Sequence, residues 1–353
     1  MPELTYHEQE KQQAVIKLRK LQKELPAFLM DYFRGIEYMN APRTIIAYAI
    51  DIKTFFEFLH DNNSSCKGMD IHNFPISILS DIKSYDIEEY LDYIKLYEKD
   101  GKTYTNNERA IKRKLSALRS MYNYYHKNKV INENPVLQVN MPKLHDKAIV
   151  RLDPNEVADL LDTVESGDGL TKKQLERHEQ LKIRDLAILT LLLGTGIRIS
   201  ECVGLDINDV DFNKSRIKVV RKGGYEAYVY FGDEVAEALN EYLIERKSKT
   251  PVAGHENALF LSNRNSRITV RNVEIMVKKY ASIVTPLKKI TPHKMRSTYG
   301  TNLYQETGDI YLVADVLGHN DVNTTKKHYA AIDTNQKYMA RNIVKLREKT
   351  DKQ

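Results

Sequence analysis

The sequence is organised around one stretch, which runs Thr291-Pro-His-Lys-Met-Arg-Ser-Thr-Tyr-Gly300, then Asp315-Val-Leu-Gly-His-Asn320 and His328-Tyr-Ala330. It brings His293, Arg296, His319 and Tyr329 within 37 residues. Because His293 and Arg296 are three residues apart, they share one face if the segment is helical. A guanidinium beside an imidazole can hold phosphate oxygens by bidentate hydrogen bonds and by proton donation. The stretch indicates chemistry at a phosphate, and it fits neither a metal site nor a Ser/His/Asp hydrolase.

Tyr329 is the candidate nucleophile of this stretch. A phenol is a poor nucleophile at neutral pH unless cations and a proton acceptor ease the loss of its proton. Two histidines and Arg296 would supply that setting. His319 stands ten residues before the tyrosine, just after Gly318, which permits a positive φ at an expected helix end.

These motifs resemble the C-terminal signature of the tyrosine recombinases, the family of phage-type integrases and Xer proteins. That signature also includes an upstream arginine in a Gly-x-Arg-x-Ser-Glu context, and Gly196-Ile-Arg198-Ile-Ser-Glu201 matches it. It includes a lysine in a hairpin turn between the two arginine motifs, where Lys222 stands between two strand-like runs. The chain is most similar to the Xer and single-recombinase Xer-like branch, although the interval from His319 to Tyr329 is one residue longer than is usual in Xer proteins.

The resemblance implies a catalytic set that breaks and rejoins DNA through a 3′-phosphotyrosyl intermediate and a Holliday junction, without a cofactor or metal ion. The exchange would serve either chromosome-dimer resolution or integration and excision of a mobile element. Its members would be Arg198, Lys222, His293, Arg296, His319 and Tyr329, with Glu201 supporting Arg198. Two other functions remain as alternatives: a DNA-relaxing enzyme of the type IB topoisomerase kind, and a non-catalytic DNA-binding relative.

Length and composition restrict the class of protein. A chain of 353 residues is long enough for two domains, each with its own core. The net charge of +6 is a mild excess that says little by itself. Cys66 and Cys202 have no CxxC partner, so neither a disulfide framework nor a zinc site is implied. There is no apolar leader and no run of about 18 apolar residues, so we expect no membrane insertion and a cytoplasmic, nucleoid-associated protein.

The expected fold is mainly α, with a helical core-binding domain followed by a mixed α/β, mostly helical catalytic domain, forming a C-shaped clamp on DNA. We expect an N-terminal helical extension over residues 1–25, the core-binding domain over 26–140, a linker over 141–150 and the catalytic domain over 151–353. The linker would let two lobes close around a duplex. The amphipathic residues after Tyr329 (a helix over 336–347) would pack on a neighbouring protomer.

In the first domain, residues 6–25 read as a helix, and a second helix begins near Pro42 and runs to residue 59. A further helix is expected within residues 87–97, followed by a turn at residues 99–102. The next helix, capped at Tyr104-Thr105, carries five cations in eleven residues. A solvated surface is the simpler interpretation, whereas the resemblance favours phosphate contacts. The predicted DNA-binding residues of this domain are Arg43, Thr44, Arg109, Lys112, Arg113, Lys114 and Arg119.

In the second domain, residues 165–182 read as an inserted loop, and residues 184–193 read as the most apolar helix. Strands are expected over residues 216–220 and 227–231, with turn chemistry between them. Arg267 and Arg271 resemble the family's segment before a DNA-facing helix and are predicted to contact DNA. The expected partner is double-stranded DNA with an inverted-repeat site. We expect a homotetramer on this DNA and a monomer or dimer when the protein is free. The need for a second recombinase or a directionality or translocase factor is left open.

Overall fold

A computed structural model describes residues 5–144, 150–221, 223–319, 321–322 and 325. The chain forms two compact units, residues 1–147 and 148–353. The boundary between them falls inside the segment expected as a linker. Each unit is described by itself.

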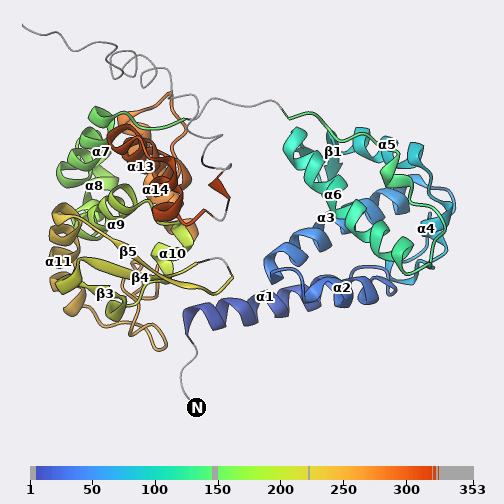
Figure 1. Cartoon of the computed structure of the whole chain (residues 1–353), viewed down its shortest axis with the longest axis horizontal. Helices are drawn as coiled ribbons and strands as arrows, with labels where there is room; N and C mark the ends of the chain where they lie inside the picture. Colours follow the sequence, from blue (N-terminus) through green and yellow to red (C-terminus); the bar gives the residue numbers. More distant parts are fainter. Residues whose placement is uncertain (1–4, 145–149, 222, 320, 323–324, 326–353) are drawn as a thin grey trace, which may run out of the picture. The chain divides into compact units, whose positions relative to one another are not determined.

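Unit 1 is built from helices, with one small hairpin (Figure 1). Its core is apolar and aromatic, with Phe55, Phe56 and Tyr90 fully buried. Helix α3 packs against both α1 and α6. The elements are α1 (Tyr6–Gln22), α2 (Leu29–Glu37), α3 (Pro42–Asn62), α4 (Ile78–Asp81), α5 (Ser84–Tyr93), β1 (Leu96–Lys99), β2 (Lys102–Thr105) and α6 (Glu108–Lys127), with short 3₁₀ turns at Ile71–Asn73 and Pro135–Leu137.

Helix α1 is part of this core. A capping box in which Thr5 and Glu8 exchange hydrogen bonds starts the helix. Leu18 and Leu25 are buried against the same cluster as the residues of α3. The region expected as an N-terminal extension therefore packs as one layer of unit 1.

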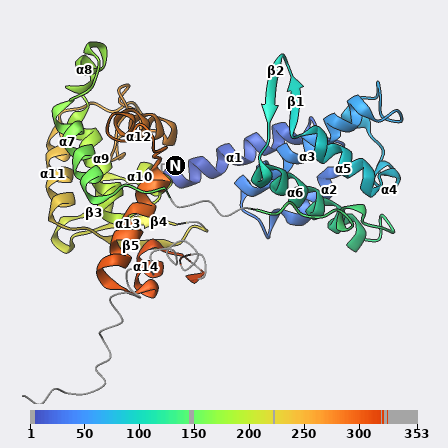
Figure 2. The same ribbon diagram turned by 90° about the horizontal axis from the view of Figure 1, so that it is seen from above.

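The structure differs from two predictions in and around residues 96–105. The helix expected within residues 87–97 ends at Tyr93, and the chain then forms the hairpin β1–β2, which projects from the helices in Figure 2. The turn between the strands is the expected one, with Asp100 and Gly101 both at positive φ, as a two-residue hairpin turn requires. The cap of α6 is Asn107, whose side chain accepts from the Ala110 N–H at 3.1 Å. Tyr104 and Thr105 lie in β2 instead.

Unit 2 surrounds the apolar helix α9, which contacts α7, α11 and α13. A three-stranded antiparallel sheet, in the order β3-β4-β5, pairs Val219 with Ala227. Ile217 and Val219 are buried, so β4 turns alternate residues to the core. The elements are α7 (Pro154–Ser166), α8 (Lys172–His178), α9 (Lys182–Thr195), α10 (Ile199–Gly204), β3 (Val210–Asp211), β4 (Arg216–Val220), β5 (Glu226–Tyr230), α11 (Asp233–Lys247), α12 (Val270–Val284), α13 (Pro292–Thr307) and α14 (Ile310–Leu317), with 3₁₀ turns at Ile207–Asp209 and Phe212–Lys214.

The prediction of a loop over residues 165–182 is wrong, because helix α8 lies within this segment. This helix has seven residues, of which only His178 is buried, so no apolar stripe announces it in the sequence. A polar chain anchors it: His178 Nδ1 lies 3.1 Å from the Tyr280 hydroxyl, which donates to Asp185 at 3.1 Å. Since that hydroxyl has only one hydrogen, the Nδ1 of His178 is the donor in the first contact.

Among the described residues, no helix combines the length and the apolar character needed to cross a membrane.

Burial of His178 predicts a pH-dependent stability. Burial, and then the nearby positive charge of Lys279, lower the pKa of His178 below its ordinary value. The unfolded chain therefore binds this proton more readily, so stability is full above the ordinary histidine pKa and falls as the pH drops below it. One such group changes the free energy of unfolding by at most about 1.4 kcal/mol per pH unit.

Thermal unfolding between pH 7.5 and 5.5 should therefore show a loss of stability in the wild type that His178→Gln reduces. His126→Gln is the matched control, since it replaces an exposed histidine of unit 1 with the same residue. An unaltered pH dependence in His178→Gln would contradict this explanation.

Candidate active site

Helix α13 sets the positions of the first motif. The Thr291 side chain accepts from the Lys294 N–H at 3.4 Å, and Pro292 occupies the first turn, where it needs no N–H partner. His293 is then exposed in that first turn, while Arg296 is buried three residues later. Both residues lie in one helix three positions apart, as the prediction of a shared face requires, but His293 is exposed where Arg296 is buried.

Arg296 joins the ends of two other helices. Its guanidinium donates to the carbonyl oxygen of Gly196 at 2.6 Å and to that of Leu317. Gly196 ends α9 in the left-handed conformation, and Leu317 is the last residue of α14. With only 5% of the residue exposed, its charge is held by main-chain oxygens that keep the guanidinium in one orientation.

Arg198 comes from the turn that follows Gly196, where it is the N-cap of α10. Its backbone N–H and its guanidinium donate to the two oxygens of the buried Glu201 carboxylate, both within 2.8 Å. A second guanidinium nitrogen donates to the Gly318 carbonyl at 3.2 Å. Glu201 therefore orients Arg198 as predicted, and 33% of the arginine side chain stays exposed.

Arg221 is a third arginine at the same place, and the sequence motifs did not assign it a role. It follows β4 directly and donates to the carbonyl of Val316 at 3.1 Å. Its only signal in the sequence is its position beside Lys222, and nothing local reveals a partner 95 residues away.

The three guanidiniums thus share the C-terminal end of α14. We call Arg198, Arg221 and Arg296 the arginine cluster; their acceptors are the consecutive carbonyls of Val316, Leu317 and Gly318. The last carbonyls of a helix have no partners within it and carry the negative end of its dipole, so cations are favoured there. Gly318 caps the helix at φ +62°, a conformation that suits glycine.

His319 is placed beside this cluster by the same cap. Its backbone N–H donates to the Ala314 carbonyl at 2.9 Å. Its Nδ1 lies 2.7 Å from the hydroxyl of Thr325, a residue that is fully buried. The structure therefore brings Arg198, Arg296 and His319 together at one helix end, as the motif order predicted.

Three elements of the predicted site lie outside the described residues. They are Lys222, Tyr329 and the helix expected over residues 336–347.

The basic face of α6 is smaller than predicted. Lys114 is buried, and it pairs with the buried Asp51 at 3.3 Å; Arg113 pairs with the same carboxylate. Arg119 donates to the carbonyls of Val136 and Val139, which fixes the segment after the helix. Lys114 and Arg119 are therefore structural cations, because their charges satisfy groups within unit 1. Arg109 is exposed and Lys112 half-exposed.

The remaining predicted DNA-binding residues also divide into one that is engaged inside its unit and others that are exposed or half-exposed. Arg267, predicted to contact DNA, donates to the carbonyls of Val203 and Leu205 and pairs with Asp206, with 9% of its side chain exposed, so its guanidinium is engaged within unit 2. Arg271 is 78% exposed and pairs with Glu274 at 3.3 Å in the first turns of α12. Arg43 is exposed and pairs with Glu10 of α1. Thr44 is half-exposed in the first turn of α3.

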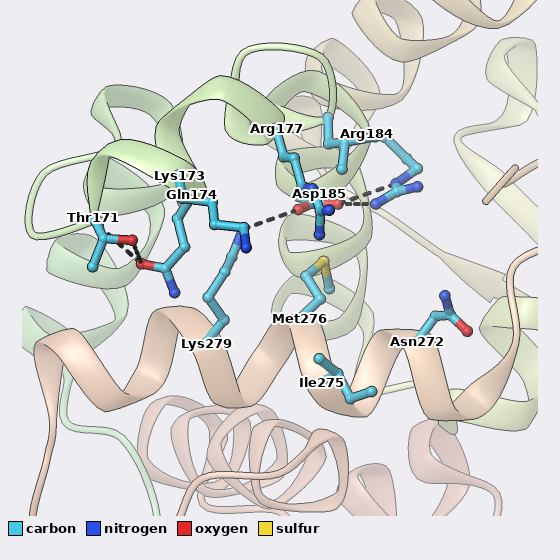
Figure 3. A pocket seen from close by; sticks show the side chains of 11 residues that line it. Thr171, Lys173, Gln174, Arg177, Arg184, Asp185, Asn272, Ile275, Met276 and Lys279 are labelled. Atoms are coloured by element: carbon cyan, nitrogen blue, oxygen red, sulfur yellow. Dashed lines mark hydrogen bonds and ion pairs between the residues drawn. The ribbon is translucent and has the colours of Figure 1, made fainter. Parts of the chain in front are cut away.

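A separate pocket of about 350 Å³ is lined by residues of α8, α9 and α12, together with neighbouring loop residues (Figure 3). Lys173 and Lys279 contribute cations to its lining. Asp185 pairs with Arg184 at 2.6 Å and lies 3.8 Å from Lys279, so the buried charges there compensate one another. None of the motif residues lines this pocket. Within the described part of the chain, no group of three His, Cys, Asp or Glu side chains is arranged to hold a metal ion.

Comparison with known proteins gives a consistent result. Residues 150–336 match the model of the phage integrase family. Tyrosine recombinase XerC of Caldanaerobacter subterraneus subsp. tengcongensis is 31% identical over 316 residues, which cover 87% of this chain and 82% of that protein. Tyrosine recombinase XerS of Streptococcus mutans is 29% identical over 346 residues, 91% of this chain and 96% of that protein. The solved XerH site-specific recombinase bound to palindromic difH substrate shares the fold, with a TM-score of 0.64 and 20% identity over 86% of this chain and 80% of that chain.

The buried pair of Lys114 and Asp51 predicts a difference in stability between neighbouring cations of α6. Lys114→Met should lower the free energy of unfolding by about 3 kcal/mol, the low end for a broken buried pair because Arg113 still faces the carboxylate. Arg109→Ala, on the exposed side of the same helix, should change it by less than about 0.5 kcal/mol. Denaturant unfolding measures both.

Adding Asp51→Asn to Lys114→Met removes the buried charge that only Arg113 still faces, and should restore part of the loss. Equal stabilities of the Lys114→Met and Arg109→Ala variants would show that the buried pair contributes nothing.

Proposed function

We propose, given that this chain belongs to the phage integrase family and is a site-specific tyrosine recombinase, that its nucleophile is Tyr329. The proposal assigns the other catalytic roles to residues that stand in the family's motifs. The structural observation that supports it best is the convergence of Arg198 and Arg296 on neighbouring carbonyls at the end of α14, beside His319.

In the proposed reaction, the phenolic oxygen of Tyr329 attacks the phosphorus of a DNA phosphodiester. A new O–P bond joins the tyrosine to the 3′ side of the break, and the bond from phosphorus to the 5′ oxygen breaks. His293 accepts the phenolic proton, and Lys222 gives a proton to the leaving 5′ oxygen. Rejoining reverses these steps with a 5′-hydroxyl of the partner strand. Since the covalent link conserves the phosphodiester energy, we expect no requirement for ATP.

Arg198 and Arg296 are proposed to hold the two non-bridging oxygens of that phosphate, and His319 to donate a hydrogen bond to it. Donors that are fixed in advance stabilise the charge that develops in the transition state, which is usually the largest catalytic contribution. Arg296 is fixed by two carbonyls, and Arg198 by Glu201. Because 33% of the Arg198 side chain is exposed, a phosphate oxygen can reach its guanidinium. With two arginines and a lysine to neutralise the charge, the step as written needs no metal ion.

The proposed DNA partner is a duplex with an inverted-repeat site, exchanged through a Holliday junction by four copies of the chain. Sequence-independent affinity would come from exposed cations at phosphates. Lys114, Arg119 and Arg267 lose this proposed role because they are engaged inside their own units. Arg113 keeps it because 48% of its side chain is exposed despite its pair with Asp51. The others that keep it are Arg43, Thr44, Arg109, Lys112 and Arg271.

The nucleophile can be tested with a nicked duplex that carries a candidate inverted-repeat site from the protein's own genomic neighbourhood. Cleavage beside the nick releases a short fragment and traps the covalent intermediate. Wild-type protein should give a denaturant-resistant protein–DNA adduct in the presence of a metal chelator, and Tyr329→Phe should give none. An adduct formed equally by Tyr329→Phe would assign the reaction to another tyrosine.

Arg198→Ala should slow adduct formation about 100- to 1000-fold, the range expected when a fixed donor to the transition state is removed. The affinity for the same duplex should stay within about threefold, since one phosphate contact among many is lost. Arg198→Lys keeps the charge next to Glu201 and controls for damage to the turn before α10. Unchanged cleavage by Arg198→Ala would remove this residue from the site.

A further inference from the structure

We propose that Arg221 is a positioning residue of the cleavage step. It fastens the β4–β5 hairpin to the C-terminal end of α14, and Lys222 is the residue that follows Arg221 in the sequence. The inference rests on the proposed role of Lys222 as the general acid. It adds a residue that the family motifs leave out, and it explains how the hairpin is placed relative to the arginine cluster.

The backbone of Arg221 closes the tip of the hairpin. Its N–H donates to the Tyr225 carbonyl at 2.7 Å, and its own carbonyl accepts from the Gly224 N–H at 3.0 Å. The β4–β5 ladder ends just before it, at the pair Val220 and Glu226. Arg221 is therefore the point at which the regular ladder passes into the tip, and whatever holds Arg221 also holds the tip.

The described residues of the tip are two glycines and an exposed tyrosine. Gly223 and Gly224 both adopt positive φ, and the Tyr225 that follows them is 75% exposed. A general acid must come within hydrogen-bond reach of the leaving oxygen, and a displacement of about 1 Å can lower a rate roughly 100-fold. A hairpin that carries such an acid therefore needs an anchor outside its own ladder.

The side chain of Arg221 provides that anchor. Its guanidinium donates to the Val316 carbonyl at 3.1 Å and lies against Gly318, where an added Cβ would overlap it. The next carbonyls, of Leu317 and Gly318, are held by the two arginines proposed to bind the phosphate. One short piece of main chain thus sets the hairpin and the phosphate-binding arginines relative to one another.

The contact is poorly suited to a purely structural role. The Nε of Arg221 is buried and has no hydrogen-bond partner among the described residues. A buried N–H without an acceptor is unfavourable, so a side chain selected only for stability would avoid it. An arginine does suit the end of a helix, where a planar cation can both lie against glycine and donate to a carbonyl.

The test compares two scissile linkages in the nicked-duplex cleavage assay. One duplex has the normal 5′ oxygen at the scissile phosphate, and the other has sulfur in that bridging position. A thiolate leaves without needing a proton, so the sulfur duplex bypasses the general acid. We expect Arg221→Ala to cleave the oxygen duplex at least about 30-fold more slowly than the wild type, and the sulfur duplex within about threefold of the wild type on sulfur.

Two further variants test whether slow cleavage by Arg221→Ala could come from a loss of folding. Arg221→Met keeps the length of the side chain without its donors and should behave as Arg221→Ala does. Lys218→Ala is the matched control, because Lys218 is another cation of β4 but pairs with Glu226 and Asp209. It should cleave both duplexes at the wild-type rate, and thermal unfolding should show all three variants folded at the assay temperature.

The outcomes separate this inference from the function on which it rests. Lys222→Ala, assayed in parallel, should also recover on the sulfur duplex; if it does not, the general-acid role of Lys222 fails. If Lys222→Ala recovers but Arg221→Ala and Arg221→Met stay slow on sulfur, Arg221 acts elsewhere and the inference is overturned. Wild-type cleavage of the oxygen duplex by either Arg221 variant overturns it too.

Discussion

The arrangement of unit 2 around its candidate site depends on the unsatisfied carbonyls at the C-terminal end of α14. A helix leaves its last carbonyls without internal partners, and here three arginines from distant segments satisfy three of them in succession. Each guanidinium brings its own element with it: the turn before α10, the end of β4 and the buried face of α13. A requirement of backbone hydrogen bonding therefore becomes the means by which separate elements meet.

Arg198 and Arg296 could be singled out from the sequence because each stands in a local motif. Arg198 with Glu201, and His293 with Arg296, lie three residues apart on helices whose starts are visible as caps and prolines. The main helices followed from apolar periodicity for the same reason, whereas the two-domain fold class was implied by the family resemblance. Arg221 escaped prediction because its partner lies on another element far along the chain, and no residue near it signals the contact.

The differences between prediction and structure have a common physical cause. A sequence shows a charged or polar side chain but not the group to which it binds. Lys114 lies in a basic run, yet it pairs with the buried carboxylate of Asp51, which is 63 residues away along the chain. Arg267 likewise serves two carbonyls and Asp206. Helix α8 was missed because a polar chain through His178 and Tyr280, rather than an apolar stripe, holds it in place.

The acceptors at the end of α14 belong to the main chain, and this has an evolutionary consequence. A substitution at Val316 or Leu317 changes a side chain but leaves its carbonyl oxygen where the arginines need it. The oxygens that orient the cluster are thus protected from mutational drift at those positions, whereas Gly318 is constrained by its conformation and by the guanidinium beside it. Lineages can therefore vary the packing around this helix while the arrangement of the arginine cluster is inherited unchanged.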